Sequence, residues 1–521
     1  MRLRLIETPY RDLIYATLAA VTVAFYVSAS GGGFPLDDSW IHQVYARNLA
    51  QYGEWSFVPG EPSGASTSPL YTVLLAVGYI LRIPYPFWTH VLGALALGVT
   101  AVIASRLGDR LTTKNSIGAF LSGLVILATW HLLWAAAAGM ETMLAAMWSL
   151  VLIWLAWREA DPERDHQNSR VVAVRGLVFG VCAALSMVTR PEGVLLAGLC
   201  GLMLLIVRPQ GTWRSVFVWS ISAVGGFAVA IAPYLLLNFT LTGGPLPSTS
   251  DAKYAQVRSI LADTTYWRRL SAMVNPLLIG GQTLLIPGAL ILLSGILSRL
   301  RGQRSVAFGL LLLLWPLALI ALYAARLPAP IQHGRYVIPA LPAFLVAGVI
   351  GLAWVTVRFQ EVVVVRVLVR TLAASAILVF LYFGCILGRT AYRQDVQFIN
   401  TELVASAQWI GENLPSQDLL AVHDIGAVGY FAPRPLLDIA GLVSPEIVPI
   451  YDSEAVWDVL RERNARYLMA FAFQIPGTQT DDPRLCLLFQ PGGESPEATA
   501  QVAAGTKMRV YEINWEGRCP E

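Results

Sequence analysis

The chain has 521 residues, of which 55% are hydrophobic and only 14% are charged. This composition excludes an ordinary soluble domain and indicates a polytopic membrane protein. The formal net charge is only +3, and no block of Lys or Arg residues occurs, so nucleic acid is not an expected partner.

The first apolar segment, residues 12–30, follows Arg2, Arg4 and Arg11. The small residues at 28–30 resemble a cleavage site, so a cleaved signal peptide is one interpretation of this segment. Its length, and the many apolar segments that follow, favour a retained membrane anchor instead.

Ten further segments are long and apolar enough to be candidate spans, because a crossing needs about 20 apolar residues. Together with the first segment they give about eleven spans. They are residues 86–107, 116–138, 142–157, 174–189, 191–207, 215–239, 277–298, 305–325, 337–356 and 370–388.

The segment 69–83 is also apolar, but it is short and bounded by prolines. If it does not cross, the N-terminal arginines and all the basic loops share one side of the membrane. Cytoplasmic loops carry such a Lys/Arg excess. We therefore predict a re-entrant or interfacial helix at 69–83, a cytoplasmic N-terminus and an extracytoplasmic C-terminus. The basic loops lie near residues 106–114, 158–175, 208–214, 299–304 and 358–370.

The more polar part, residues 389–521, has the pattern of a small extracytoplasmic α/β domain. We expect helices at 398–413 and 454–464, and strands at 419–424, 466–473 and 508–515. Cys486 and Cys519 lie in this part, and an oxidising compartment would allow them to form a disulfide.

Two adjacent carboxylates, Asp37 and Asp38, follow the first apolar segment in the stretch GGGFPLDDSWIH. One aspartate there could simply cap the amphipathic helix that begins at this point. Two carboxylates exceed what a cap needs, and their desolvation at a membrane surface is costly without a cationic partner.

Glu141 is the second unusual acid, because it lies between two apolar segments in WAAAAGMETMLAAMW. It could be an interfacial residue that begins a helix, but an isolated acid at membrane depth is also a functional candidate. If Glu141 converges on Asp37 and Asp38, the group suits general-base catalysis or a divalent cation such as Mg²⁺, Mn²⁺ or Ca²⁺.

Four groups that carry or can carry positive charge are predicted on the same face as these acids. Any one of them could reach out to lipid phosphates. Together with the acids they indicate an anionic substrate, and a phosphate leaving group fits Arg and Lys contacts. They are Arg190, Lys253, His333 and Arg335.

These motifs resemble the GT-C superfold of integral-membrane glycosyltransferases, which transfer a sugar from a polyprenyl-phosphate carrier. An acidic pair opens the first extracytoplasmic loop, residues 31–85, and an amphipathic helix and Ser68-Pro69-Leu70 follow it. The stretch YARNLAQYGEWSFVPGEPSGASTSPLYTVLL is similar to bacterial arabinofuranosyltransferases and their relatives. The resemblance implies a catalytic membrane domain over residues 1–388 and an extracytoplasmic α/β domain over 389–521, in a bacterial plasma membrane.

The resemblance also implies roles for single residues. Asp37 would be the catalytic base, with Glu141 as a second acid. The role of Asp38 stays open, because several branches have Asp-Glu where this chain has Asp-Asp. HGRYVIPALP resembles a motif near the carrier phosphate, which implicates His333, Arg335 and Tyr336. TGGPLPSTSDAK resembles a loop of the same relatives that ends in a lysine, here Lys253. With Arg190 from the charge pattern, these are the expected donor-phosphate residues. The residues expected to support the loop or the acceptor are His42, Glu61 and Ser68.

We therefore predict a membrane glycosyltransferase that uses a polyprenyl-phosphate sugar donor and inverts the anomeric centre. Its acceptor would be a cell-envelope glycan, lipid or protein. A secondary transporter is one alternative, although transporters place their binding residues near the midplane, often in repeated halves. A sensor or scaffold acting through its C-terminal domain is another.

Overall fold

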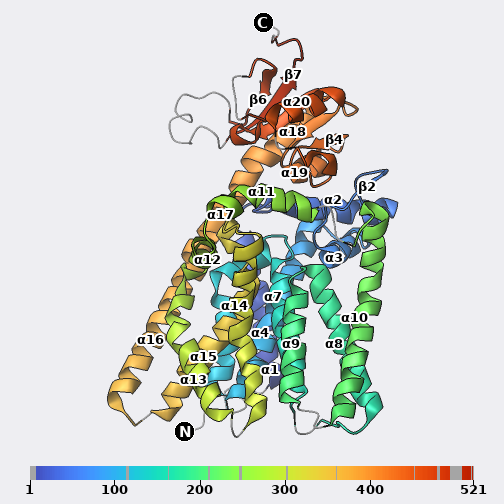
Figure 1. Cartoon of the computed structure of the whole chain (residues 1–521). Coiled ribbons are helices and arrows are strands. Elements are labelled where there is room, and N and C mark those ends of the chain that lie inside the picture. The colour runs from blue at the N-terminus through green and yellow to red at the C-terminus, as the bar shows by residue number, and fades with distance from the viewer. Residues whose placement is uncertain are drawn as a thin grey trace. The chain divides into compact units, whose positions relative to one another are not determined.

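The computed structural model of the chain describes residues 8–112, 116–161, 164–208, 212–245, 249–300, 303–359, 361–450, 452–477, 482–492, 507–517 and 519. The chain forms two compact units (Figure 1). The first comprises Met1–Ala29, Thr89–Tyr234 and Val257–Ala391. The second comprises Ser30–Trp88, Leu235–Gln256 and Tyr392–Glu521.

The first unit is a bundle of apolar helices, which run side by side in Figure 1. Short 3₁₀ turns lead into several of them, and a π-helical turn, Phe383–Leu387, follows α16. The helices are α1 (Thr8–Val27), α4 (Tyr85–Leu111), α5 (Ile117–Ala128), α6 (Trp130–Ala137), α7 (Thr142–Arg158), α8 (Ser169–Thr189), α9 (Gly193–Val207), α10 (Trp213–Thr242), α12 (Tyr266–Val274), α13 (Ile286–Arg299), α14 (Leu311–Arg326), α15 (Leu341–Arg358) and α16 (Val363–Tyr382).

Each segment predicted to cross the membrane is largely helical, although 116–138 is divided between α5 and α6 and 277–298 begins in 3₁₀ turns before α13. Among the described residues, seven helices are long and apolar enough to span a bilayer, and a pair bent by 55°, α5 with α6, gives an eighth candidate. Helices α7 and α9 are apolar but shorter. The prediction of a polytopic α-helical membrane protein with a C-terminal α/β domain is confirmed. The predicted number of about eleven spans exceeds the seven or eight candidates found among the described residues.

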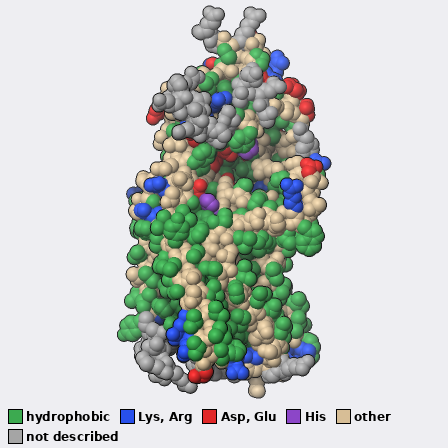
Figure 2. All heavy atoms as spheres, turned by 90° about the vertical axis from the view of Figure 1, so that its left-hand side faces the viewer, with side chains coloured by type: hydrophobic (Ala, Val, Ile, Leu, Met, Phe, Trp, Pro, Cys, Tyr) green, Lys and Arg blue, Asp and Glu red, His purple; other side chains and the backbone are tan. Residues whose placement is uncertain are grey.

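The outer surface of this bundle is apolar, as a lipid-facing surface must be. Figure 2 shows hydrophobic side chains over a broad band of one side, where α16 lies. On α16 the exposed apolar side chains include Val364, Leu368 and Leu378, each about two-thirds exposed. In water such a patch would be an interaction or aggregation site, so it supports a membrane setting.

Ion pairs join four helix ends of the first unit that carry the basic residues predicted to share one side. Arg11, in the first turn of α1, pairs with Asp109 of α4 at 2.7 Å, and Arg106 of α4 pairs with Asp12 of α1. Arg110 at the end of α4 binds Asp161 at 2.7 Å, just after α7. Glu159 pairs with two arginines near the start of α8, Arg164 at 2.8 Å and Arg175 at 3.4 Å.

The second unit combines the first loop with the C-terminal α/β domain. The loop holds α2 (Asp37–Tyr52), the hairpin of β1 (Ser56–Val58) and β2 (Glu61–Pro62), and α3 (Pro69–Ile80). With 12 residues, α3 is too short to span a bilayer by itself. The re-entrant or interfacial placement of 69–83 stays a prediction.

The α/β domain contains a five-stranded mixed sheet in the order β4-β3-β5-β7-β6. β3 pairs in parallel with β4 and β5, while β7 pairs antiparallel with β5 and β6. The expected strands at 419–424, 466–473 and 508–515 correspond to β3, β5 and β7. The elements are β3 (Leu420–Val422), β4 (Leu436–Asp438), β5 (Tyr467–Phe471), β6 (Leu485–Phe489), β7 (Met508–Ile513), α17 (Gly388–Phe398), α18 (Ala405–Asn413), α19 (Ile425–Phe431) and α20 (Ser453–Glu462).

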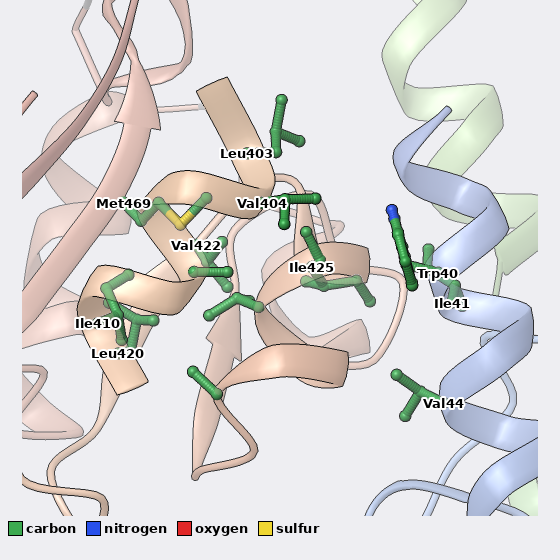
Figure 3. Packing of buried hydrophobic residues seen from close by; sticks show 14 of the residues in the cluster. Trp40, Ile41, Val44, Leu403, Val404, Ile410, Leu420, Val422, Ile425 and Met469 are labelled. Atoms are coloured by element: carbon green, nitrogen blue, oxygen red, sulfur yellow. The ribbon is translucent and has the colours of Figure 1, made fainter. Parts of the chain in front are cut away.

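Side chains of the central strands point alternately to the two faces of the sheet, and each face packs against its own hydrophobic core. Leu420 and Val422 of β3 join a core that includes α2, α18 and α19, whereas Ala421 joins a core with Trp457 of α20. Figure 3 shows Trp40, Ile41 and Val44 of α2 pointing toward the side chains of the α/β domain. The first loop therefore contributes part of the hydrophobic core of the C-terminal domain.

Candidate functional site

Asp37 is the first residue of α2, and its carboxylate is bound by a helix far away in the sequence. Oδ2 accepts the backbone N–H of Gly426 and Oδ1 that of Ala427, each at 2.7 Å. These amides belong to the first turn of α19, where N–H groups have no partner within the helix. Asp37 thus caps α19. The residue before α2 is Leu36, whose side chain makes no cap.

The close approach of Asp37 to α19 depends on Gly426. A methyl group at position 426 would lie 2.1 Å from the backbone oxygen of Asp37 and 2.8 Å from its Oδ2. Any larger residue would therefore push the carboxylate away from the amides of α19. The stretch DIGAVGYF holds this glycine, and it belongs to the part of the sequence that resembles related extracytoplasmic domains.

Arg47, ten residues along from Asp37, binds the other end of α19. Its Nη1 donates to the carbonyl oxygen of Tyr430 at 2.9 Å and its Nη2 to that of Gly429 at 3.1 Å. Carbonyls at a helix C-terminus lack intrahelical partners and favour cations. One helix, α2, therefore supplies an anion to the N-terminus of α19 and a cation to its C-terminus. We call this pair of contacts the α2–α19 clamp.

Asp424 occupies the position from which a residue normally caps its own helix, but its side chain does not cap α19. Its Oδ1 lies 3.1 Å from Nδ1 of His423, and its Oδ2 accepts a hydrogen bond from Gln474 at 2.8 Å. Because Asp37 has taken over the cap, a second carboxylate remains close to the first.

The electrostatics of this corner favour a basic Asp37. Burial, together with the negative charges of Asp424 and Asp38, raises the pKa of Asp37, and the two amide hydrogen bonds only partly oppose this. The pKa of His423 is also raised, because its contact with Asp424 outweighs the effect of burial. The side chains of His423 and Asp424 are 30% and 26% exposed, so this corner remains in contact with solvent.

The other predicted residues of the second unit lie in the first loop, except Lys253. His42 is buried on α2, with Nδ1 3.3 Å from the hydroxyl of Thr72, and it packs against Tyr71. Ser68 is buried directly before α3. Glu61 is exposed on β2, Asp38 is half-buried on α2, and Lys253 is half-buried on α11 (Thr249–Asp263).

The first unit holds a separate group of buried charges at Arg190, between α8 and α9. Its guanidinium contacts Glu141 Oε1 at 3.1 Å, Glu192 Oε1 at 2.7 Å and the Tyr323 hydroxyl at 2.8 Å. Tyr323 in turn donates to Glu192 at 2.8 Å. Arg190 and both glutamates are at most 8% exposed. Arg190 is therefore fixed among acids and does not extend toward lipid phosphates.

Tyr336 and Arg335, both predicted to bind phosphate, belong to the same buried group. The Tyr336 ring lies 5.3 Å from that of Tyr323, and the guanidinium of Arg190 lies 5.2 Å from the Tyr336 ring centre. Arg335 is buried, donates to the Tyr336 hydroxyl at 3.1 Å and lies over the same ring at 4.9 Å. The cluster therefore contains two cations and two carboxylates, whose formal charges balance.

His333 sits in a left-handed turn just before this cluster. Gln332, His333 and Gly334 have φ of 52°, 57° and 73°. Only glycine adopts such values without strain, and strained non-glycine residues concentrate at functional sites. The imidazole lies edge-on to Trp130 and Trp134, with ring centres 5.1 Å apart in both cases.

The predicted residues thus divide between the two units. Glu141, Arg190, Arg335 and Tyr336 are joined by contacts in the first unit. Sequence reasoning missed Glu192, Tyr323, His423 and Gln474 as members of these clusters. Glu192 could have been found, since it follows Arg190 by two residues in the same turn and carries the opposite charge. Tyr323 lies in an apolar segment, where nothing in the sequence marks it as a partner of Arg190.

Two further predictions concern metal and disulfide chemistry. Within the described part of the chain, no three His, Cys, Asp or Glu side chains are arranged to hold a metal ion. A divalent cation at Asp37, Asp38 and Glu141 therefore gains no support from the geometry. Cys486 and Cys519 are joined by a disulfide that ties β6 to the C-terminal segment.

Comparison with solved structures identifies the fold. ArnT from Cupriavidus metallidurans bound to undecaprenyl phosphate matches with a TM-score of 0.56 at 14% identity, over 97% of this chain and 99% of that one. The oligosaccharyltransferase AglB from Archaeoglobus fulgidus, in complex with an inhibitory peptide and a dolichol-phosphate, matches with a TM-score of 0.52 at 12% identity, over 98% and 75%. The chain has the GT-C fold. The predicted resemblance to this superfold is therefore confirmed.

Sequence comparison adds little beyond the fold. Residues 388–512 match a family described as a domain of unknown function, DUF8728. No curated protein matches the chain. Within the GT-C fold, the first loop and the loops between helices thus have to be interpreted from their own residues, because one fold can host many activities.

The buried charge cluster gives a stability prediction. Arg190→Gln would leave Glu141 and Glu192 buried without their shared cation, and breaking such a pair costs about 3–5 kcal/mol. We expect a clear fall in Tm of the purified protein in detergent. Arg326→Gln, at the exposed end of α14, is the matched control and should leave Tm nearly unchanged. Equal shifts for the two variants would contradict the buried cluster.

The α2–α19 clamp gives a second prediction. Gly426→Ala should separate Asp37 from the amides of α19 and lower Tm, because the added methyl group has no space beside Asp37. Gly411→Ala on α18 is the matched control, since its methyl group would have no neighbour nearer than 3.4 Å. Removing backbone freedom there should be neutral or stabilise by about 0.4–1 kcal/mol. A stable Gly426→Ala protein would argue against the clamp.

Proposed function

We propose that this protein is a membrane glycosyltransferase that moves a sugar from a polyprenyl-phosphate carrier to an acceptor hydroxyl on the extracytoplasmic side of a bacterial plasma membrane. One observation carries the proposal. A chain with the GT-C fold holds, at the first acid of its first loop, an oriented and partly accessible carboxylate whose pKa is raised.

In the proposed reaction Asp37 removes the proton of the acceptor hydroxyl. The resulting nucleophile attacks the anomeric carbon while the bond to the carrier phosphate breaks on the opposite face. Such a transition state has oxocarbenium character, as in glycoside hydrolysis, and a single displacement inverts the anomeric centre. The proton ends on Asp37, and the polyprenyl phosphate leaves with the bonding electron pair.

The geometry of Asp37 supports its role as the base. A carboxylate has about four lone-pair positions, and the two amides of α19 use one on each oxygen. The remaining positions can accept a substrate proton, while the amides fix the direction in which the carboxylate points. A raised pKa makes the carboxylate a stronger base and brings it nearer the operating pH, which is the optimum for general-base catalysis.

The donor phosphate needs cations where its charge develops as it leaves. We assign this role to Arg335 and Lys253, with His333 and Tyr336 as supporting groups. Arg335 suits it because its guanidinium is held over Tyr336, and a fixed guanidinium can bind a phosphate through two hydrogen bonds. The resemblance to arabinofuranosyltransferases makes polyprenyl-phosphate arabinose the first donor to test.

The base assignment predicts a selective loss of activity. Asp37→Asn should reduce sugar transfer from a polyprenyl-phosphate sugar by at least a hundredfold, since general-base catalysis contributes about 10²–10⁴. The measurement is transfer of a radiolabelled sugar by purified protein in nanodiscs. A wild-type protein that takes up solute into liposomes but transfers no sugar would favour a transporter instead.

Arg47→Gln is the control that separates catalysis from architecture. It weakens the α2–α19 clamp at the opposite end of α19 and leaves the carboxylate of Asp37 in place. We expect this variant to keep most of the transfer activity. If Asp37→Asn and Arg47→Gln lose activity equally, with equal falls in Tm, Asp37 acts only as a structural residue.

The neighbouring carboxylate gives a pH prediction. The rate should rise with pH as Asp37 loses its proton. Asp424→Asn removes a negative charge that raises the pKa of Asp37, so this acidic limb of kcat/KM should move to lower pH. Asp458→Asn, on the exposed face of α20, should leave the limb where it is. An unmoved limb in Asp424→Asn would contradict the assignment of Asp37 as the titrating base.

The product is best identified in cells. Mass spectrometry of membrane glycoconjugates from cells with and without the gene should show one class that lacks a single sugar when the gene is deleted. That class would name both the sugar and the acceptor.

A further inference from the structure

A cavity of about 240 Å³ lies in the second unit, at the edge of its mixed sheet. One wall is the β1–β2 hairpin of the first loop, with Phe57 and Glu61. The opposite wall is edge strand β4 and the segments that follow it, with Ser444, Glu446 and Arg463. The cavity therefore forms only where the first loop packs against the α/β domain.

Both walls are held in place by hydrogen bonds. Ser63, which lines the cavity, lies 2.6 Å from the hydroxyl of Tyr45 and accepts the N–H of Phe57 at 3.2 Å. On the opposite side, Ser444 accepts the N–H of Asp438 at 3.0 Å. The cavity is thus part of the folded structure and does not depend on a ligand to form.

The lining suits a small neutral ligand that has both hydroxyl groups and C–H faces. Val58 offers apolar contact, whereas Glu61 and Glu446 accept hydrogen bonds and Arg463 donates them. The volume is below the range of about 300–1,000 Å³ that holds drug-sized ligands. It fits a group of the size of one sugar ring.

The charges of the cavity select against phosphate. Arg463 binds Glu446 at 3.1 Å, so its charge is already balanced. Glu61 then gives the lining a net negative charge, which repels an anion. The donor, which carries a phosphate, is therefore a poor occupant, and a neutral sugar is a good one.

The cavity is also connected to the proposed base through α19. Phe57 of the cavity wall lies directly against Gly429, where an added methyl group would come within 2.3 Å of the phenyl ring. The same helix holds Asp37 at its N-terminus. One seven-residue helix thus contacts both the acid and the wall of the cavity.

We propose that this cavity binds one uncharged sugar residue of a glycan acceptor. The inference deepens the proposed function and rests on it, because it specifies the acceptor among the glycan, lipid and protein candidates. Glu61 and Glu446 accept hydrogen bonds from the sugar hydroxyls, Arg463 donates one, and Val58 covers a C–H face. The α/β domain thereby recognises the acceptor.

Binding is tested on the full chain in nanodiscs by saturation-transfer-difference NMR, with methyl glycosides of glucose, galactose, mannose and arabinose as probes. At least one glycoside should receive saturation from the wild-type protein. Val58→Trp, which fills the cavity, should abolish the signal, and Glu61→Gln should weaken binding about tenfold. Glu462→Gln, an exposed residue beside Arg463 that does not line the cavity, should bind like the wild type.

Three results would overturn the inference. They are the absence of saturation transfer to every glycoside, equal binding by wild-type and Val58→Trp proteins of equal Tm, and competition by a short peptide but not by a sugar. The last would make the occupant a protein acceptor. The proposed function fails separately, if the wild type transfers no sugar while glycoside binding at the cavity persists. Where transfer occurs, both cavity variants should raise the KM for a glycan acceptor.

Discussion

Two hydrogen bonds to one carboxylate, from the amides of Gly426 and Ala427 to Asp37, fix the arrangement on which the second unit depends. They satisfy the first turn of α19, orient Asp37 and free Asp424 to remain a nearby charge. Arg47 completes the arrangement at the other end of the helix. An acid that could have been a simple cap is instead a cap for a helix almost four hundred residues away.

The clamp also shows how a structural role and a catalytic role can coexist in one side chain. Amide hydrogen bonds hold the carboxylate still without filling its remaining lone pairs, while its own burial and neighbours of like charge make it more basic. The structural role has a cost for the sequence. Position 426 must lack a side chain, and α2 must present an acid and an arginine ten residues apart.

In the first unit the main constraint is the desolvation cost of burying charged side chains in an apolar bundle. Arg190 is buried, and it is tolerable because Glu141, Glu192 and Tyr323 occupy its donors. The residues come from the ends of α7, α8, α9 and α14, where helices stop and loops can bring distant side chains together. Tyr336 and Arg335 extend the same group from the start of the segment before α15.

The sequence by itself determined where the apolar helices lie, the α/β character of the C-terminal part and the unusual acids, but not the number of helices long enough to cross a membrane. Hydropathy, charge bias and residue pattern are local properties, so they could be followed without knowing any contact. Only the tertiary structure decided which partners those residues meet. In the folded chain Asp37 caps α19 and Arg190 pairs with two glutamates. The first loop contributes Trp40, Ile41 and Val44 to the core of the C-terminal domain. The chemistry of a buried hydrophobic or charged side chain shows that it needs a partner. It does not specify which distant segment of the chain provides that partner.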